Sequence, residues 1–270
     1  MFLKSLVATS VLASAVLASP AAQKDEFQRR KIIGGELAEE DDFPFIVSLQ
    51  LGGSHNCGGS LLNSDTVLTA AHCGLESEAA NMTIRAGSLN QKTGGIVVPV
   101  ASITHHPGWA DESEQTDIAI WKLEQALPNV AAISYASILQ EGSDPVPGTM
   151  ATVAGWYVQT GPGDVLPDIE SGSDLLMKVE VPILARDTCR LWHANLSQVV
   201  NVTNDMVCAG LAEGGRDSCF GDSGGPLIDS RSRNLIGIVS WGGLICAAVE
   251  QPGVYTRIDS LRSWINKFLP

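Results

Sequence analysis

The feature that most restricts the fold of this chain is a long series of short apolar runs separated by turn-forming residues. The runs are rich in valine, isoleucine, leucine and threonine, and glycine, proline, asparagine and aspartate lie between them. Such a pattern is typical of an all-β sandwich or barrel. The runs that we predict to be strands are 45–51, 66–69, 82–86, 96–103, 118–123, 149–154, 175–183, 206–209, 226–228, 235–241 and 253–258.

The series has an interruption and a distinct end. Residues 124–148 contain three prolines and no comparable run, so we predict a linker between two halves. The last segment differs, because its apolar residues follow helical spacing and predict one amphipathic helix that packs on the body. These residues are Ile258, Leu261, Trp264, Ile265 and Phe268.

The first residues resemble a secretory signal peptide. Lys4 precedes an apolar run over 6–17, and small residues follow at 18–22, so we predict cleavage after Ala18 or Ala22 and a secreted, extracellular protein. The run is shorter than the ~20 residues that cross a bilayer. A buried N-terminal helix is the alternative.

Residues 19–31 are polar and end in a basic cluster directly before an apolar, glycine-containing stretch. Arg29, Arg30 and Lys31 precede Ile32-Ile33-Gly34-Gly35. This shift predicts a processing site, so that 19–31 is an activation propeptide; the alternative is a solvated N-terminal arm.

Six cysteines in a secreted chain predict three disulfides. Fifteen pairings exist, and the spacing alone selects none of them. Metal binding is the alternative, but the sequence has no C-x-x-C motif and no zinc-finger spacing. Three sequons predict N-glycosylation at Asn81, Asn195 and Asn201.

The chain is acidic, with a formal net charge of −13. Residues 1–31 carry five basic and two acidic side chains, so their removal lowers the charge to −16. This balance argues against a nucleic-acid partner. It is compatible with cationic substrates, although a solvated surface gives the same balance.

Residues 216–226 are the strongest candidate for a catalytic segment. Ser223 lies among glycines and directly follows Asp222. Serine needs a base and oxyanion donors to act as a nucleophile, and glycines allow a sharp, exposed turn. An ordinary surface turn is the alternative. The segment also fits the G-x-S-x-G elbow of α/β-hydrolases, but that fold needs a histidine after the serine, and the last histidine is His193.

The base and the acid must therefore come from upstream of the serine. His72 ends an apolar run, and Asp117 begins another, where a partly buried carboxylate needs a hydrogen-bond donor. Each of them alone has an ordinary structural alternative, a core histidine or a strand cap. We expect His105 and His106, beside Pro107, to lie in an exposed loop.

Several motifs in a fixed order make the chain resemble the chymotrypsin-family serine proteases, most of all the secreted trypsin-like enzymes. The resemblance covers about residues 32–270. It implies two six-stranded antiparallel β-barrels with the active site between them, an N-barrel of about 32–135, a C-barrel of about 145–257 and a C-terminal helix of about 258–268. The motifs are Ile32-Ile33-Gly34-Gly35, Cys57-Gly58-Gly59-Ser60, Thr69-Ala70-Ala71-His72-Cys73, Asp117-Ile118-Ala119, Gly155-Trp156, Gly221-Asp222-Ser223-Gly224-Gly225-Pro226, Ser240-Trp241-Gly242 and Pro252-Gly253-Val254-Tyr255.

The resemblance implies a catalytic triad. Ser223 would be the nucleophile, His72 the general base and then acid, and Asp117 the carboxylate that orients His72. The N–H groups of Gly221 and Ser223 would form the oxyanion hole. The substrate backbone would pair with Ser240, Trp241 and Gly242.

The resemblance also implies a pocket for a basic side chain. Asp217 would lie at its base, favouring cleavage after Arg or Lys. Ser218, Gly242 and Gly253 would line it. Phe220 and Ile245 depart from the usual residues near the entrance and put the preference between Lys and Arg in doubt.

A zymogen and a disulfide pairing follow from the same resemblance. Cleavage after Lys31 would free the amine of Ile32 to pair with Asp222. His55 resembles a position that holds this aspartate in some zymogens. The implied disulfides are Cys57–Cys73, Cys189–Cys208 and Cys219–Cys246.

The resulting interpretation is a secreted, monomeric serine endopeptidase without a cofactor. Residues 87–96 lack the acidic pair of the trypsin calcium loop, so we expect no calcium or other metal there. The expected partners are proteins or peptides with Lys or Arg and proteinaceous protease inhibitors, with no nucleic acid and no membrane. The alternatives are the same fold with apolar or narrow specificity, and a non-catalytic binding homologue; the intact triad argues against the latter.

Overall fold

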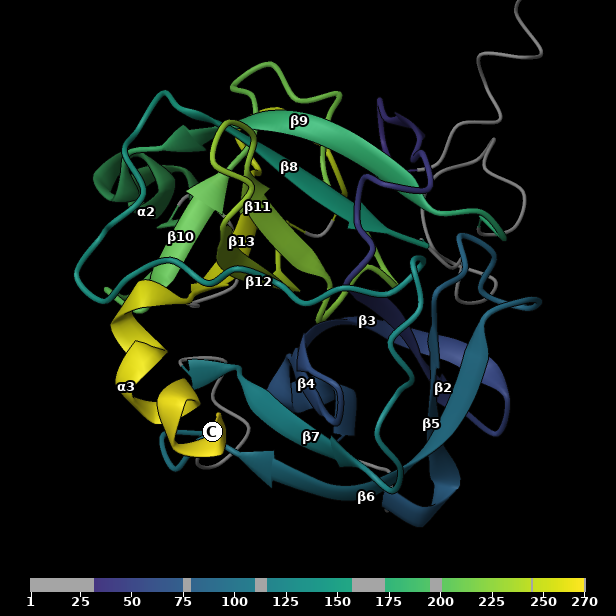
Figure 1. Cartoon of the computed structure of the whole chain (residues 1–270). Coiled ribbons are helices and arrows are strands. Elements are labelled where there is room, and N and C mark those ends of the chain that lie inside the picture. The colour runs from purple at the N-terminus through teal and green to yellow at the C-terminus, as the bar shows by residue number, and fades with distance from the viewer. Residues whose placement is uncertain are drawn as a thin grey trace, which may run out of the picture.

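The computed structural model of the protein consists of two closed, six-stranded antiparallel β-barrels, which lie one above the other in Figure 1. The predicted all-β, two-barrel fold is thus confirmed. The structure describes residues 32–74, 79–109, 116–156, 173–194, 201–243 and 245–269.

The first barrel has the strand order β2-β3-β4-β7-β6-β5 and closes through the pairing of β2 with β5. Along β5, Met82, Ile84 and Ala86 are buried and the residues between them are half-buried, which is the alternation expected of a barrel wall. Its strands are β2 (Ile46–Leu51), β3 (Ser54–Asn63), β4 (Thr66–Thr69), β5 (Met82–Ala86), β6 (Ile96–His105) and β7 (Ala119–Leu123).

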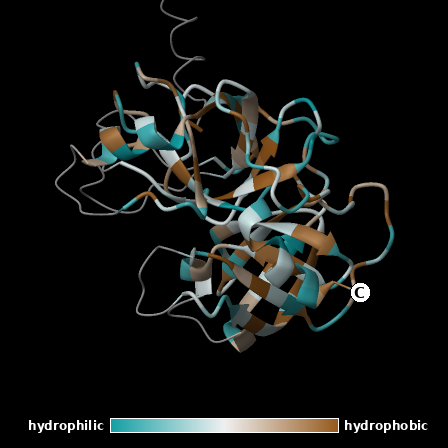
Figure 2. Ribbon diagram, turned by 90° about the vertical axis from the view of Figure 1, so that its left-hand side faces the viewer, coloured by the Kyte–Doolittle hydropathy of each residue, from teal (hydrophilic) through white to brown (hydrophobic). Residues whose placement is uncertain are grey.

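The second barrel has the order β9-β10-β13-β12-β11-β8 and closes through β8 and β9, while the short β1 (Glu36–Leu37) adds to β9. In Figure 2 the strands of the barrels carry much of the hydrophobic colour. The strands of this barrel are β8 (Met150–Gly155), β9 (Met177–Leu184), β10 (Met206–Ala209), β11 (Pro226–Asp229), β12 (Leu235–Trp241) and β13 (Gly253–Arg257).

The sequence did not predict strand β3, because Gly58 and Gly59 resemble a turn. Both glycines are instead required by packing within the strand. A Cβ on Gly58 would lie 2.8 Å from the Cα of Gly225, and one on Gly59 would lie 2.8 Å from a methyl carbon of Val67. The strand therefore passes directly beside the segment that carries Ser223.

The predicted C-terminal helix is confirmed, and it consists of three short helical turns in succession: η4 (Asp259–Leu261), α3 (Arg262–Ile265) and η5 (Asn266–Phe268). Ile258, Leu261 and Trp264 recur every third residue, a spacing that suits a 3₁₀-helix as well as an α-helix. Ile258, Leu261, Trp264 and Ile265 belong to the core cluster that contains the first barrel. The end of the chain thus leaves the second barrel and packs on the first, as Figure 1 shows.

A further helix, α2 (Arg186–Ala194), was not predicted; the disulfide Cys189–Cys208 joins it to β10. The other two disulfides are Cys57–Cys73 and Cys219–Cys246, so all three pairings implied by the resemblance are present. Among the described residues, no helix is long and apolar enough to cross a membrane.

Candidate active site

Ser223 lies in a tight turn of the loop that precedes β11. The backbone N–H of Asp222 donates to the carbonyl of Cys219 at 3.0 Å, and that of Gly225 donates to the carbonyl of Asp222 at 2.9 Å. The carboxylate of Asp222 in turn accepts the N–H of Cys219 at 2.8 Å. These bonds fix the turn, and Ser223 remains partly exposed on it.

The Ser223 turn is docked against the first barrel. The N–H of Gly58 donates to the carbonyl of Ser223 at 2.8 Å. Gly224 has a positive φ of 76°, and a Cβ there would lie 2.1 Å from the hydroxyl of Thr69 and 3.2 Å from the sulfur of Cys73. Glycine is therefore required at 224, and the residue after Ser223 touches the residue after His72.

His72 is held by a buried carboxylate. Its Nδ1 lies 2.7 Å from Oδ2 of Asp117, and its backbone N–H donates to Oδ1 at 3.0 Å. Asp117 is 1% exposed, and the hydroxyl of Ser240 donates to its Oδ2 at 2.6 Å. Since a carboxylate can only accept, Nδ1 carries the hydrogen, and in the neutral imidazole Nε2 is then the basic nitrogen. This tautomer can accept a proton at Nε2.

The pKa of Asp117 reflects two opposing effects. Burial raises it, but the hydrogen bond and charge of His72, together with the hydroxyl of Ser240, outweigh burial, so the pKa is lowered from its usual value. Asp117 thus stays ionised and can stabilise a positive charge on the imidazole.

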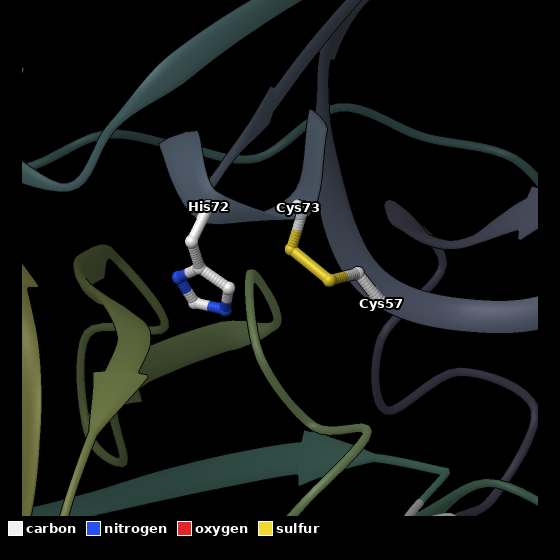
Figure 3. A group of neighbouring side chains, drawn as sticks. All are labelled: Cys57, His72 and Cys73. Carbon is white, nitrogen blue, oxygen red and sulfur yellow. A yellow bond between two sulfur atoms is a disulfide. The ribbon is translucent and has the colours of Figure 1, made fainter. Parts of the chain in front are cut away.

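The side chains of Cys57, His72 and Cys73 lie together, with their ligand atoms within 4.8 Å of one another. Figure 3 shows the two sulfurs bonded to each other beside the imidazole. Disulfide sulfurs are not thiolates, which are the form that binds metals. This cluster therefore does not fit a metal site; the disulfide instead anchors the segment that carries His72.

A second buried carboxylate, Asp217, lies six residues before Ser223 and is 3% exposed. Its oxygens accept the N–H groups of Ser218 at 2.8 Å and Ala247 at 3.3 Å. Burial raises the pKa of Asp217 to about 7. A Cβ on Gly253 would lie 2.6 Å from Oδ1, whereas a Cβ on Gly242 would meet nothing closer than 3.8 Å. A carboxyl group that titrates near neutral pH thus lies inside the fold between two glycine-bearing segments.

His55 contacts the residue that the resemblance assigns to the oxyanion hole. Its Nε2 donates to the carbonyl of Gly221 at 2.9 Å, and its Nδ1 lies 2.8 Å from the hydroxyl of Ser48. The ring packs edge-on against Trp156, with centroids 5.5 Å apart. Burial lowers the pKa of His55 to about 4, so it is neutral at pH 7. These bonds fix His55 on the carbonyl of Gly221.

Ile32 and Asp222 are both fully buried in or beside the second barrel. Ile32 belongs to its core, and Ile33 pairs with Asp217 in an antiparallel bridge. A Cβ on Gly155 would lie 2.2 Å from the carboxylate of Asp222, so only glycine leaves room for that group. The first described residues thus run beside the segment that carries Asp217.

The other residues that the sequence singled out differ in how exposed they are. Asn81 and Asn201 are exposed, as are Phe220 and Ile245, which flank the disulfide Cys219–Cys246. Lys31, Asn195, and the expected segments 1–18 and 19–31 lie outside the described residues. His105 is not in a loop as expected, because it ends β6 and is half-buried.

Ser48 and Tyr255 also lie near the site, although no sequence pattern assigned them to it. Tyr255 is fully buried, and its hydroxyl lies 3.2 Å from that of Ser218. Ser48 and Gln50 both interrupt the apolar residues of β2, so the sequence signal of a polar residue in an apolar run does not single out Ser48.

Comparisons with known proteins find similar sequences over most of the chain. The family model described as Trypsin matches residues 32–265. Trypsin beta of Drosophila erecta is 37% identical over 87% of this chain and 87% of its own length. Trypsin 5G1 of Aedes aegypti is 35% identical over 88% of this chain and 84% of its own. A vitellin-degrading protease of Bombyx mori is 35% identical over 88% and 85%.

Proposed function

Because this chain belongs to the trypsin family of serine endopeptidases, we propose that it is a secreted enzyme, made as a zymogen, that cleaves peptide bonds after Arg or Lys. The observation that carries this specificity is Asp217, a buried carboxylate beside two glycine-bearing segments. A guanidinium or ammonium group would supply the counter-charge that the carboxylate lacks among its backbone donors, whereas an apolar side chain would leave it buried and uncompensated.

The reaction would use Ser223, His72 and Asp117. The hydroxyl oxygen of Ser223 attacks the carbonyl carbon, and its proton moves to Nε2 of His72. The N–H groups of Gly221 and Ser223 donate to the resulting oxyanion. The C–N bond then breaks, and His72 returns the proton to the leaving amine. Water repeats the sequence on the acyl-enzyme, with His72 again as base, and releases the acid and free Ser223.

Substrate would bind along the end of β12. The backbone of Ser240, Trp241 and Gly242 would pair with the residues before the scissile bond, and the basic side chain would enter between Gly242 and Gly253 to reach Asp217 beside Ser218. Gly242 leaves this entrance free, because even a Cβ there would touch nothing closer than 3.8 Å.

Activation would follow cleavage between Lys31 and Ile32. The burial of Ile32 in the second-barrel core and of Asp222 beside it supports a pairing of the new ammonium with that carboxylate. In this proposal 1–18 (or 1–22) is the signal peptide, 19–31 the propeptide and 32–270 the monomeric protease domain. Exposed Asn81 and Asn201, together with Asn195, would carry glycans.

The test is hydrolysis of matched peptides with Arg, Lys or Phe before the scissile bond, by protein with a free Ile32 amine. The Asp217→Ser variant is assayed alongside. We expect strong preference for Arg and Lys that collapses in the variant. Full activity of protein whose Lys31–Ile32 bond is uncleaved would contradict the proposal that the enzyme is made as a zymogen.

An apolar specificity is the second candidate, because Phe220 and Ile245 are 47% and 42% exposed beside the pocket disulfide. Cleavage after Phe that is insensitive to Asp217→Ser would favour it. We also expect proteinaceous inhibitors, which would bind to the surface that binds the substrate.

A further inference from the structure

Residues 32–43 form a strap that leads from the second barrel to the first. Ile32 lies in the second-barrel core, and Phe43 belongs to the core cluster that contains the first barrel. Between these two residues only Ala38 is buried. Figure 1 shows the strap in purple beside β9, with which its strand β1 pairs over two residues. Because the strap buries little apolar surface, it depends largely on polar contacts to stay on the second barrel.

Lys178 of β9 contacts the strap near both of its ends. Its Nζ lies 2.6 Å from Oδ2 of Asp42 and 3.7 Å from Oε1 of Glu36. The side chains of Lys178 and Asp42 are each 20% exposed. The backbone of Lys178 also meets the strap, because a Cβ on Gly35 would lie 2.5 Å from its carbonyl oxygen. One residue of β9 thus holds two parts of the strap that lie several residues apart.

Asp42 is fixed by further contacts. Its Oδ2 accepts the backbone N–H of Glu39 at 2.7 Å, and its backbone carbonyl accepts a hydrogen bond from the guanidinium of Arg233. The same guanidinium lies over the ring of Phe43, 5.2 Å from the centroid. Arg233 belongs to the turn between β11 and β12, so the second barrel holds the end of the strap from two sides.

The pair of Lys178 and Asp42 is charged at neutral pH. Burial raises the pKa of Asp42, but the hydrogen bond and charge of Lys178 contribute to a net lowering. The hydrogen bond to Asp42 raises the pKa of Lys178 against the effect of burial. The other charged groups that face the pair are Glu36, Glu39 and Arg233. The strap is therefore held by a partly buried ion pair that also makes hydrogen bonds.

This anchor and the burial of Ile32 depend on each other. Withdrawal of Ile32 from the core would pull Gly35 and Glu36 away from Lys178. Conversely, loss of the anchor at Asp42 would lengthen the free part of the chain that ends at Ile32. A short tether keeps a chain end at a high effective concentration near its binding place, and a longer one lowers that concentration.

We propose that Lys178 is a positioning residue for activation, because its ion pair with Asp42 holds the strap where the new amine of Ile32 reaches Asp222. The strap is thus fastened to the second barrel by charge. This inference rests on the proposed activation by cleavage between Lys31 and Ile32.

Three variants test the anchor. Lys178→Met keeps the length of the side chain and removes its charge, and Asp42→Asn keeps an acceptor oxygen but removes the negative charge. Lys178→Arg keeps the charge and the donor. The matched control is Lys122→Met, because Lys122 is also partly exposed and pairs with a carboxylate, Asp65, at 3.0 Å, but it does so in the first barrel and beside the carbonyl of Phe268.

The first measurement is the rate at which cyanate carbamylates the Ile32 amine of activated enzyme, followed by mass spectrometry of the N-terminal peptide. Cyanate reaches the amine only when Ile32 is withdrawn, so this rate reports insertion and does not depend on catalysis. We expect a rate about tenfold higher in Lys178→Met and Asp42→Asn, the effect typical of one charge-assisted hydrogen bond. Lys178→Arg and Lys122→Met should react as slowly as wild type.

The second measurement is the alkaline limb of kcat/KM for an arginine peptide, with active sites titrated. Only the protonated amine can pair with Asp222, so insertion is complete at lower pH and is lost as pH rises. A tenfold weaker insertion moves the midpoint of that loss about one pH unit lower. We expect this shift in Lys178→Met and Asp42→Asn and in neither of the other two variants.

Two results would overturn the inference in different ways. If Lys178→Met protects the amine as well as wild type does and keeps its alkaline midpoint, losing only thermal stability, the positioning role is wrong and the proposed activation stands. If the amine of Ile32 in wild-type enzyme reacts as fast as that of a short peptide, Ile32 is not inserted. In that case the proposed activation is wrong, and the inference falls with it.

Discussion

The neutral state of His55 makes the stability of this protein depend on pH in acid. Its pKa is lowered from 6.5 to about 4 by burial, against the opposing effect of the carbonyl of Gly221. Between these values the unfolded chain binds a proton that the folded protein excludes, so acid favours unfolding. At about 1.4 kcal/mol per pKa unit, His55 alone should cost about 3 kcal/mol of unfolding free energy between pH 7 and pH 4.

His55→Gln isolates this effect, because glutamine does not titrate and still offers a donor to Gly221 and an acceptor to Ser48. Urea unfolding of both proteins, in a Ser223→Ala background that prevents self-digestion, is measured at pH 4, 7 and 9. The loss of stability from pH 7 to pH 4 should be about 3 kcal/mol smaller in the variant. From pH 7 to pH 9 the two proteins should keep a constant difference. Equal acid sensitivity of the two proteins would refute the reasoning.

Three further outcomes are expected. Gly253→Ala should abolish cleavage after Arg, because its Cβ would lie 2.6 Å from the carboxylate of Asp217. Gly242→Ala should retain measurable activity, because its Cβ would meet nothing closer than 3.8 Å. Equal losses of kcat/KM in the two variants would contradict this prediction. Benzamidine affinity should fall about tenfold per pH unit below pH 7, because burial raises the pKa of Asp217 to about 7 and protonation removes the negative charge that binds the ligand. A similar pH dependence in Asp217→Asn would assign the titration to another group. Ser240→Ala should raise the pKa of Asp117 by removing the 2.6 Å hydrogen bond, and should shift the acid limb of the pH profile of kcat/KM to higher pH. An unchanged pH profile would show that the hydrogen bond from Ser240 has no influence on the acid limb.

Local patterns in the sequence predicted most of the strands but not the packing between them. Runs such as 66–69, 82–86, 206–209 and 235–241 coincide with β4, β5, β10 and β12. Strand β3 was missed because its two glycines are required by close packing in the fold. Gly58 lies against Gly225, far along the chain, and Gly59 lies against Val67 on the adjacent strand β4; neither contact has a local signature in the sequence.

The candidate site shows the same contrast between local motifs, which the sequence reveals, and packing contacts, which it does not. The order of motifs led to the prediction of His72, Asp117, Ser223 and Asp217 as site residues. The supporting contacts of His55 with Gly221 and of His193 with Trp241 join segments 166 and 48 residues apart, and neither histidine lies in a recognisable motif for that role. The fold determines such partnerships: the contact of His55 with Gly221 arises only when both barrels are formed, and that of His193 with Trp241 only when α2 has packed on the second barrel.

The path of the C-terminal segment has a consequence for biosynthesis. The apolar side chains of Ile258, Leu261, Trp264 and Ile265 complete the core of a barrel whose own strands end at Leu123. During translation that barrel can form its strands early, but its core stays open until the last turns have left the ribosome. The Ser223 turn docks on the same barrel through Gly58, so the proposed catalytic groups meet in their final arrangement only once both barrels and this segment have folded. A nascent or prematurely terminated protease would therefore be inert inside the cell that makes it.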